Sequence, residues 1–201
     1  IIITVQQIKT VMKKQFFFFA FGAILLLISC KQQSQKAGTQ IDKDLKDFVK
    51  QNPGVNAGAG TFSIEATEGW TKIDTTISGL QVVLLKSGME SQSDVFMENI
   101  NVITEKTNDM SLDDYFKANL ASLKNGMPGY EKISDDNVTI NSREAHHLIY
   151  THTYTGTPTE VEAYFFVQGK LGYVITCSTE KGKLAKWKPL FDKAVNTFDI
   201  N

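Results

Sequence analysis

From Thr61 onward, short apolar runs alternate with turn residues, and this spacing predicts a series of β-strands. The predicted strands are Thr61–Ile64, Trp70–Ile73, Gln81–Lys86, Val95–Thr104, Tyr130–Ser134, Val138–Ile140, Arg143–Tyr154, Glu160–Gln168 and Leu171–Ser178. The last strands are joined by short turns, such as Asn141-Ser142 and the two-residue link Gly169-Lys170, which favour hairpins. The sheet is therefore predicted to be mostly antiparallel.

Between the strands, one stretch has apolar positions at helical spacing. It begins at Ser111, a typical N-cap residue followed by two acidic residues, and ends at Asn125-Gly126. Asn119 alone interrupts the apolar stripe, which consists of Leu112, Tyr115, Phe116, Leu120 and Leu123.

A second helical stripe closes the chain, with Trp187, Leu190, Phe191, Ala194, Val195 and Phe198. Proline fits the first turn of a helix, so Pro189 places the predicted start near Trp187 and makes Lys181–Lys186 a connection. A short helix is also predicted at Asp42–Gln51, before a glycine-rich stretch that runs to Gly60.

The later strands are apolar on both faces. In Glu160–Gln168, Phe165 and Phe166 point in opposite directions, and in Leu171–Ser178 the residues Tyr173 and Val174 do the same. A sheet with one wet face would alternate apolar and polar residues more cleanly. We therefore expect helices on both sides of the sheet, which gives an α+β fold with a three-layer α/β/α sandwich.

The amino-terminal part has a different pattern. Lys13 and Lys14 precede thirteen apolar residues, Phe16–Ile28, and the small residue Ser29 follows. A basic start, an apolar middle and a small residue at the end are typical of a signal peptide. The apolar run is shorter than the ~20 residues that a membrane-spanning helix needs. An uncleaved anchor and an unlipidated secretory signal are the alternatives.

The segment Leu27-Ile28-Ser29-Cys30 resembles the lipobox of bacterial lipoproteins. The resemblance implies a diacylglyceryl group on the Cys30 thiol, cleavage before Cys30, and acylation of the new amine by a fatty acid such as palmitate. Residues 1–11 do not fit a signal peptide and are interpreted as an upstream extension before a start at Met12. The expected organisation is a signal peptide at 12–29, a lipidated tether at 30–60 and one domain at 61–201.

The same resemblance also indicates which membrane carries the protein. In enterobacterial lipoproteins, aspartate after the lipidated cysteine signals retention in the inner membrane, and this chain has Lys31 there. An acidic run of the kind that marks surface export in some bacteria is absent from Lys31–Gln40. The resemblance therefore implies the outer membrane, with the domain facing the periplasm.

Charge and cysteine content exclude some classes of function and of site. The only charged residues before Cys30 are Lys9, Lys13 and Lys14, so 18 of the 21 basic and all 22 acidic residues belong to the part from Cys30 onward. This acidic part contains a single arginine, Arg143, whereas nucleic-acid binding needs a clustered basic face. With Cys30 assigned to lipid, Cys177 has no partner, so neither a disulfide nor a cysteine zinc site is expected.

Several local sequences resemble the PsbP-like superfamily, which includes photosystem II extrinsic subunits and bacterial envelope proteins. They are Gly69-Trp70, Phe96 with Asn99–Val102, Ser111–Tyr115, Asn141–Ala145, Ala163–Phe165, Gly172–Thr176 and Phe191–Phe198. These are core and turn positions, so the resemblance implies a fold for roughly Thr61–Asn201. It also implies a non-enzymatic binding or assembly role, without catalytic, cofactor or metal residues.

Candidate chemistry rests on few residues. His146, His147 and His152 lie on one predicted strand, where His146 and His152 share a face but are about 20 Å apart at ~3.3 Å per residue. Glu160 or Glu162 on the next strand could complete a surface metal site across the hairpin. Cys177 shares a face with Tyr173 and is expected to be a buried thiol, and Ser134–Asn137 is expected to be a turn.

These observations favour a lipid-anchored envelope module without catalytic activity. It would be a monomer that captures a protein or a ligand through a sheet edge or a groove beside a helix, with the membrane as its other partner. Two alternatives are an envelope enzyme or metal-binding protein that uses His146 and His152 with Glu160 and Glu162, and a structural stress protein without a discrete ligand.

Overall fold

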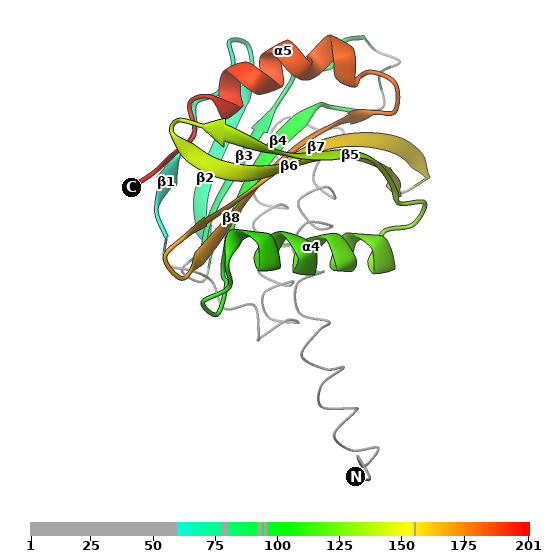
Figure 1. The fold of residues 1–201 in the computed structure, drawn as a ribbon. Helices are drawn as coiled ribbons and strands as arrows, with labels where there is room; N and C mark the ends of the chain where they lie inside the picture. Colours follow the sequence, from blue (N-terminus) through cyan, green and yellow to red (C-terminus); the bar gives the residue numbers. More distant parts are fainter. Residues whose placement is uncertain (1–59, 78–79, 92–93, 95, 155) are drawn as a thin grey trace.

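A seven-stranded sheet with a helix on each side forms the domain (Figure 1). The computed structural model describes residues 60–77, 80–91, 94, 96–154 and 156–201. The strands of the sheet are β2 (Thr71–Ile77), β3 (Leu80–Lys86), β4 (Asn99–Lys106), β5 (Glu131–Ile140), β6 (Arg143–Tyr154), β7 (Thr157–Gln168) and β8 (Leu171–Glu180). Their spatial order is β2-β3-β4-β8-β7-β6-β5, and every neighbouring pair is antiparallel.

The predicted three-layer α+β architecture is confirmed. Helices α4 (Leu112–Gly126) and α5 (Leu184–Val195) lie on opposite sides of the sheet, as Figure 1 shows. Two separate hydrophobic clusters fill the spaces between the layers. The strands are apolar on both faces because each face packs against its own cluster, with Phe165 in the α4 layer and Phe166 in the α5 layer.

The α5 layer holds the larger core. Phe191, on α5, is fully buried and meets Trp70 edge-on at 6.0 Å between ring centroids. A two-stranded sheet of β1 (Phe62–Ser63) and β9 (Asp199–Ile200) joins the two ends of the domain to this layer. Both Phe62 and Phe198 are part of the cluster, so the two ends of the domain are held by burial as well as by backbone pairing.

Helix α4 has the predicted boundaries. The Ser111 hydroxyl accepts a hydrogen bond from the backbone N–H of Asp114 at 3.1 Å, which satisfies one of the free donors of the first turn. The helix ends at Gly126, as expected from Asn125-Gly126. Tyr115 and Phe116, from the predicted stripe, are buried against the sheet.

The predicted start of α5 near Trp187 is wrong, because the helix begins at Leu184. Leu184 is buried and extends the apolar stripe toward the amino terminus, and Glu160 Oε2 accepts hydrogen bonds from its N–H and from that of Gly182. This carboxylate replaces a local N-cap for the free donors of the first turn. Pro189 therefore lies inside the helix.

The predicted turn at Ser134–Asn137 is also wrong. These residues continue through the single long strand β5, whose register against β6 shifts between Lys132 and Ser134. The strand lies at the edge of the sheet and is exposed along most of its length, so polar residues occupy it without cost to a core. Strand β4 also differs from the prediction, beginning at Asn99 and ending at Lys106.

Several predictions lie outside the described residues. They are the extension at 1–11, the signal peptide at 12–29, the lipidated Cys30 and the short helix at Asp42–Gln51. Within the described part of the chain, neither α4 nor α5 combines the length and the apolar character needed to cross a bilayer.

Candidate functional site

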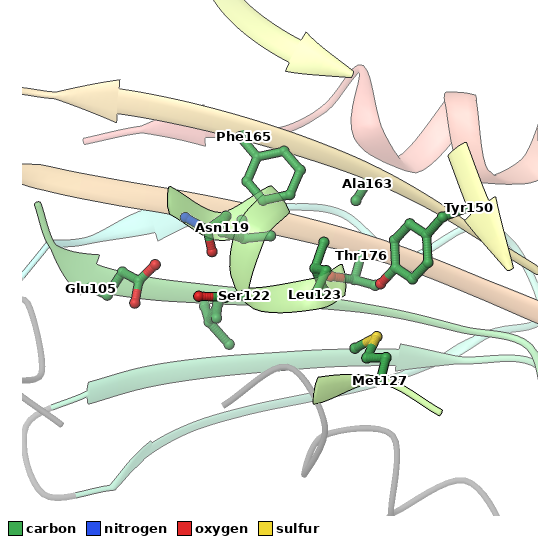
Figure 2. Close-up of a pocket in the computed structure, with 11 residues that line it drawn as sticks. Glu105, Asn119, Ser122, Leu123, Met127, Tyr150, Ala163, Phe165 and Thr176 are labelled. Carbon is green, nitrogen blue, oxygen red and sulfur yellow. The ribbon is translucent and has the colours of Figure 1, made fainter. Parts of the chain in front are cut away.

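A pocket lies between helix α4 and the face of the sheet formed by β4, β8, β7 and β6 (Figure 2). It is partly open to solvent, and its cavity volume is about 40 Å³. Apolar walls come from residues such as Ile103, Leu123, Met127 and Val174. Polar groups gather at its two ends, with Glu105, Asn119 and Ser122 at one and Tyr150 with Thr176 at the other.

Glu105 is the ionisable carboxyl group of this pocket. It lies near the end of β4, and its Oε1 accepts a hydrogen bond from the Tyr115 hydroxyl at 2.5 Å. Burial raises the pKa of Glu105 to about 7, although hydrogen bonds from Tyr115 and Asn119 oppose the rise. The carboxyl group therefore changes charge near neutral pH while two side chains of α4 hold it in place.

Gly172 lets Tyr115 reach this carboxyl group. Glu105 and Gly172 are directly paired on neighbouring strands, and Tyr115 crosses over Gly172 from α4. A Cβ atom at position 172 would lie 2.4 Å from Cζ of the tyrosine ring, which is closer than any real contact. The missing side chain in β8 is thus a requirement of the Tyr115–Glu105 contact.

Polar side chains continue along the sheet beyond the far end of the pocket. Thr176 is paired with Asn101, and the next pair on this face is Asn99 with Ser178. Asn101, Asn99 and Ser178 are at most 1% exposed, and their side chains include buried oxygen and nitrogen atoms without a hydrogen-bond partner. This face of the sheet is consequently amphipathic, with hydrogen-bonding capacity that the described residues leave unused.

The raised pKa of Glu105 predicts how stability depends on pH. The unfolded chain ionises first, near pH 4.5, and the folded chain near pH 7. The stability linked to this group is therefore complete below about pH 4.5 and is lost as the pH rises through 7, by on the order of 3 kcal/mol. Glu105→Gln cannot ionise, so its free energy of unfolding in urea should lack this fall between pH 4 and 8. A parallel loss in both chains would contradict the assignment.

The histidines do not form the metal site considered from the sequence. His146 and His152 lie on the α4 face of the sheet, where His146 Nε2 is 2.8 Å from Asp113 Oδ1 and stacks on Phe116. Glu160 and Glu162 contact α5 on the opposite face. The structure therefore does not bring the histidines of this alternative together with the glutamates, because neighbouring strands carry these two pairs on different faces. In the described residues, no group of three or more His, Cys, Asp or Glu is placed to hold a metal ion.

His147 and Glu162 belong to an ionic network under α5. Glu162 Oε1 lies 2.7 Å from His147 Nε2 and 2.7 Å from Lys188 Nζ. Burial lowers the pKa of His147, but hydrogen bonds and charges from Glu162 and Asp136 outweigh it and raise the pKa. Burial raises the pKa of Glu162, but hydrogen bonds and charges from His147 and Lys188 outweigh burial and lower this pKa. This network stabilises the contact of α5 with the sheet.

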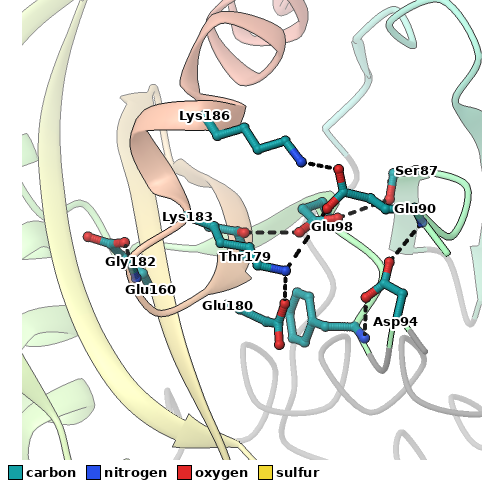
Figure 3. A network of polar contacts seen from close by, with 11 residues as sticks. Ser87, Glu90, Asp94, Glu98, Glu160, Thr179, Glu180, Gly182, Lys183 and Lys186 are labelled. Carbon is teal, nitrogen blue, oxygen red and sulfur yellow. Dashed lines mark hydrogen bonds and ion pairs between the residues drawn. The ribbon is translucent and has the colours of Figure 1, made fainter.

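A second polar network fixes the loop after β3 to the start of α5 (Figure 3). Buried Glu98 accepts hydrogen bonds from Ser87 Oγ at 3.3 Å and Thr179 Oγ1 at 3.0 Å, and burial raises its pKa. At the surface, Lys186 pairs with Glu90, which brings the loop against the helix. Both Glu98 and Glu90 have partners within the protein, so we interpret this network as structural.

Cys177 is fully buried on the α5 face, as expected from its strand neighbours. Burial raises the pKa of its thiol well above the ordinary value. A neutral, covered thiol is a poor nucleophile.

Neither Glu105 nor its partners are among the residues that the sequence pattern nominates for chemistry. One signal was present, because Asn119 interrupts an otherwise apolar helical stripe. A second was the strand segment Asn99-Ile100-Asn101-Val102, in which amides alternate with core residues. Both signals identify polar groups that face the core, but neither shows that β4 and α4 meet at Glu105.

Comparisons with known proteins agree on the fold. No protein-family model matches the chain, and neither does any curated protein. The solved structure of LpqN from Mycobacterium tuberculosis, involved in cell envelope biogenesis, is similar with a TM-score of 0.55 at 14% identity, covering 74% of this chain and 87% of that one. PA94, a Pseudomonas aeruginosa protein of unknown function, has a TM-score of 0.54 at 15% identity, covering 69% and 96%.

The structural neighbours also include a member of the superfamily that the sequence resembles. Cyanobacterial PsbP from Synechocystis has a TM-score of 0.46 at 15% identity, covering 74% of this chain and 96% of that one. At the identities of LpqN and PA94, similarity shows a shared fold and leaves function to the residues of this chain.

Proposed function

We propose that this chain is a lipid-anchored binding module of the bacterial cell envelope, and that it binds a small ligand in the pocket between α4 and the sheet. The observation that carries the binding role is the Glu105 carboxyl group at the end of an otherwise mostly apolar pocket. Ligand sites combine apolar walls with a few placed polar groups, and residues with perturbed pKa values cluster at functional sites. The proposal assigns no catalytic step.

The location rests on the amino-terminal sequence. Lys13, Lys14, Phe16–Ile28 and the lipobox-like Leu27–Cys30 support export and acylation of Cys30, with palmitate among the fatty acids. Lys31 supports the outer membrane, with the domain in the periplasm. LpqN, which shares the fold, is involved in cell envelope biogenesis, and this supports the same compartment.

Filling the pocket tests the binding role. Ser122 lies on the pocket-facing side of α4, whereas its neighbour Ala121 is exposed. The full chain should be purified from bacterial envelopes, and the small molecules that it retains should be identified by mass spectrometry. We expect wild type and Ala121→Phe to retain the same compound and Ser122→Phe to lose it, because the new ring occupies the cavity.

Two results would contradict the role. One is a wild-type chain that retains no compound above the level of an unrelated lipoprotein. The other is equal retention by Ser122→Phe, measured on protein whose thermal unfolding matches that of Ala121→Phe.

A further inference from the structure

The Glu105 carboxylate is prepared for negative charge but lacks a positive partner. Tyr115 donates to Oε1 at 2.5 Å, and the Asn119 side chain also stabilises the ionised form. Among the described residues, none of the ion pairs includes Glu105. Glu162, the buried carboxylate of the network under α5, has Lys188 and His147 beside it. Buried Glu98 likewise accepts hydrogen bonds only from hydroxyl groups, Ser87 Oγ and Thr179 Oγ1, but Glu105 differs from it in lining the pocket.

Asn119 is itself fixed in place, which makes the arrangement at Glu105 rigid. Its Nδ2 donates to the backbone carbonyl of Tyr115 at 3.0 Å, one turn back along α4. Tyr115 is fully buried and is held between Gly172 and Phe165. Both groups that orient the carboxylate are therefore held by contacts within the protein, so a charge brought to Glu105 would meet a preformed acceptor.

We infer that the pocket takes a small organic cation, a protonated primary amine on a short apolar chain, with its ammonium group against Glu105. This deepens the binding role proposed above and rests on it. The ammonium supplies the positive partner that the carboxylate lacks, and Ser122 lies at the same end of the pocket to accept a further hydrogen bond. The chain of the ligand then runs past Leu123 toward Met127.

Other charge types fit less well. An anionic ligand would place a second negative charge next to Glu105 with no cationic side chain lining the pocket. A buried charge is costly unless it is paired, so ionised Glu105 favours a cation over a neutral isostere. The cavity of about 40 Å³ restricts the enclosed part of the ligand to a few heavy atoms.

Three probes of equal length test the inference: n-butylammonium, n-butanol and butyrate. Their binding to the full chain in a neutral maltoside detergent can be measured by saturation-transfer NMR. We expect n-butylammonium to bind most tightly at pH 8. Because its site must be ionised, the affinity should fall about thirtyfold at pH 5.5, given a pKa of about 7 for Glu105.

Glu105→Gln should weaken binding at least ~tenfold and remove the pH dependence, which is the loss expected for a charged partner. Glu131→Gln, which removes an exposed carboxylate on β5, should change neither.

The outcomes separate the two proposals. If n-butanol binds as well as n-butylammonium, and Ser122→Phe abolishes both, then the pocket binds ligands and only the preference for a cation is overturned. If n-butylammonium binding in wild type is independent of pH, the cation inference is wrong whether or not Glu105→Gln folds. If no probe binds and no compound is retained from envelopes, both proposals fail.

Discussion

In cells that make the Cys30→Ala chain, incorporation of a labelled fatty acid into the protein should fall to zero. Acylation needs the thiol of Cys30, and the only other cysteine, Cys177, is buried in the sheet. A single acyl chain gives marginal membrane binding, whereas two or more hold a protein stably. The variant should therefore also disappear from the outer-membrane fraction.

Cys177→Ala is the matched control for this experiment. It removes a cysteine from the core but leaves the amino-terminal sequence intact, so fatty-acid labelling and membrane fractionation should stay as in wild type. Persistent labelling of Cys30→Ala, or labelling lost equally in Cys177→Ala, would refute acylation at Cys30. If the mass of the purified wild-type protein still includes the signal peptide, this result would support the alternative of an uncleaved anchor.

Gly172→Ala is expected to lower the free energy of unfolding by about 3 kcal/mol, the upper end of the range for an overpacked core. The new methyl group would lie 2.4 Å from Tyr115 Cζ, and the ring is fully buried and packs edge-on against Phe165 of β7. Moving Tyr115 would also break its hydrogen bond to Glu105. Chemical denaturation measures the loss.

A double-mutant cycle separates this cause from a general effect of glycine replacement. In a Tyr115→Ala background the obstructing ring is gone, so Gly172→Ala should cost less than ~1 kcal/mol, a deviation from additivity typical of residues in contact. Gly88→Ala is the control, because Gly88 has open space around its Cβ position. Equal costs of Gly172→Ala in both backgrounds would exclude the steric explanation.

The layered architecture could be predicted because it depends on local patterns. Residues such as Phe165 and Phe166 make both strand faces apolar, and Ser111 is a cap whose partner is three residues away. Long-range competition explains the errors. Glu160, distant in sequence, satisfies the first turn of α5, so Pro189 does not set its start. Pairing with β6 extends β5 through Ser134–Asn137, although this segment has turn composition.

The candidate site was less accessible to sequence reasoning. Glu105, Tyr115 and Gly172 come from three elements, and their meeting depends on the order of strands β4 and β8 in the sheet. The combination of His146 and His152 with Glu160 and Glu162 failed for the same reason. Spacing along one strand gives the face of each residue on that strand, but only the register between β6 and β7 shows that Glu162 and His152 point to opposite layers.

The pairing of β1 with β9 determines where mechanical load enters the domain. A pull on the chain ahead of residue 60 reaches Phe62 first, and the strand that holds it has only two paired positions. Besides the hydrogen bonds between the Gln81 side chain and the backbone of Phe62, resistance comes from the side chains of Phe62 and Ile64, which are 3% and 0% exposed. In a domain tethered at its amino end, two buried side chains would thus resist a pull on the tether, and the short backbone pairing of β1 with β9 would contribute little to this resistance.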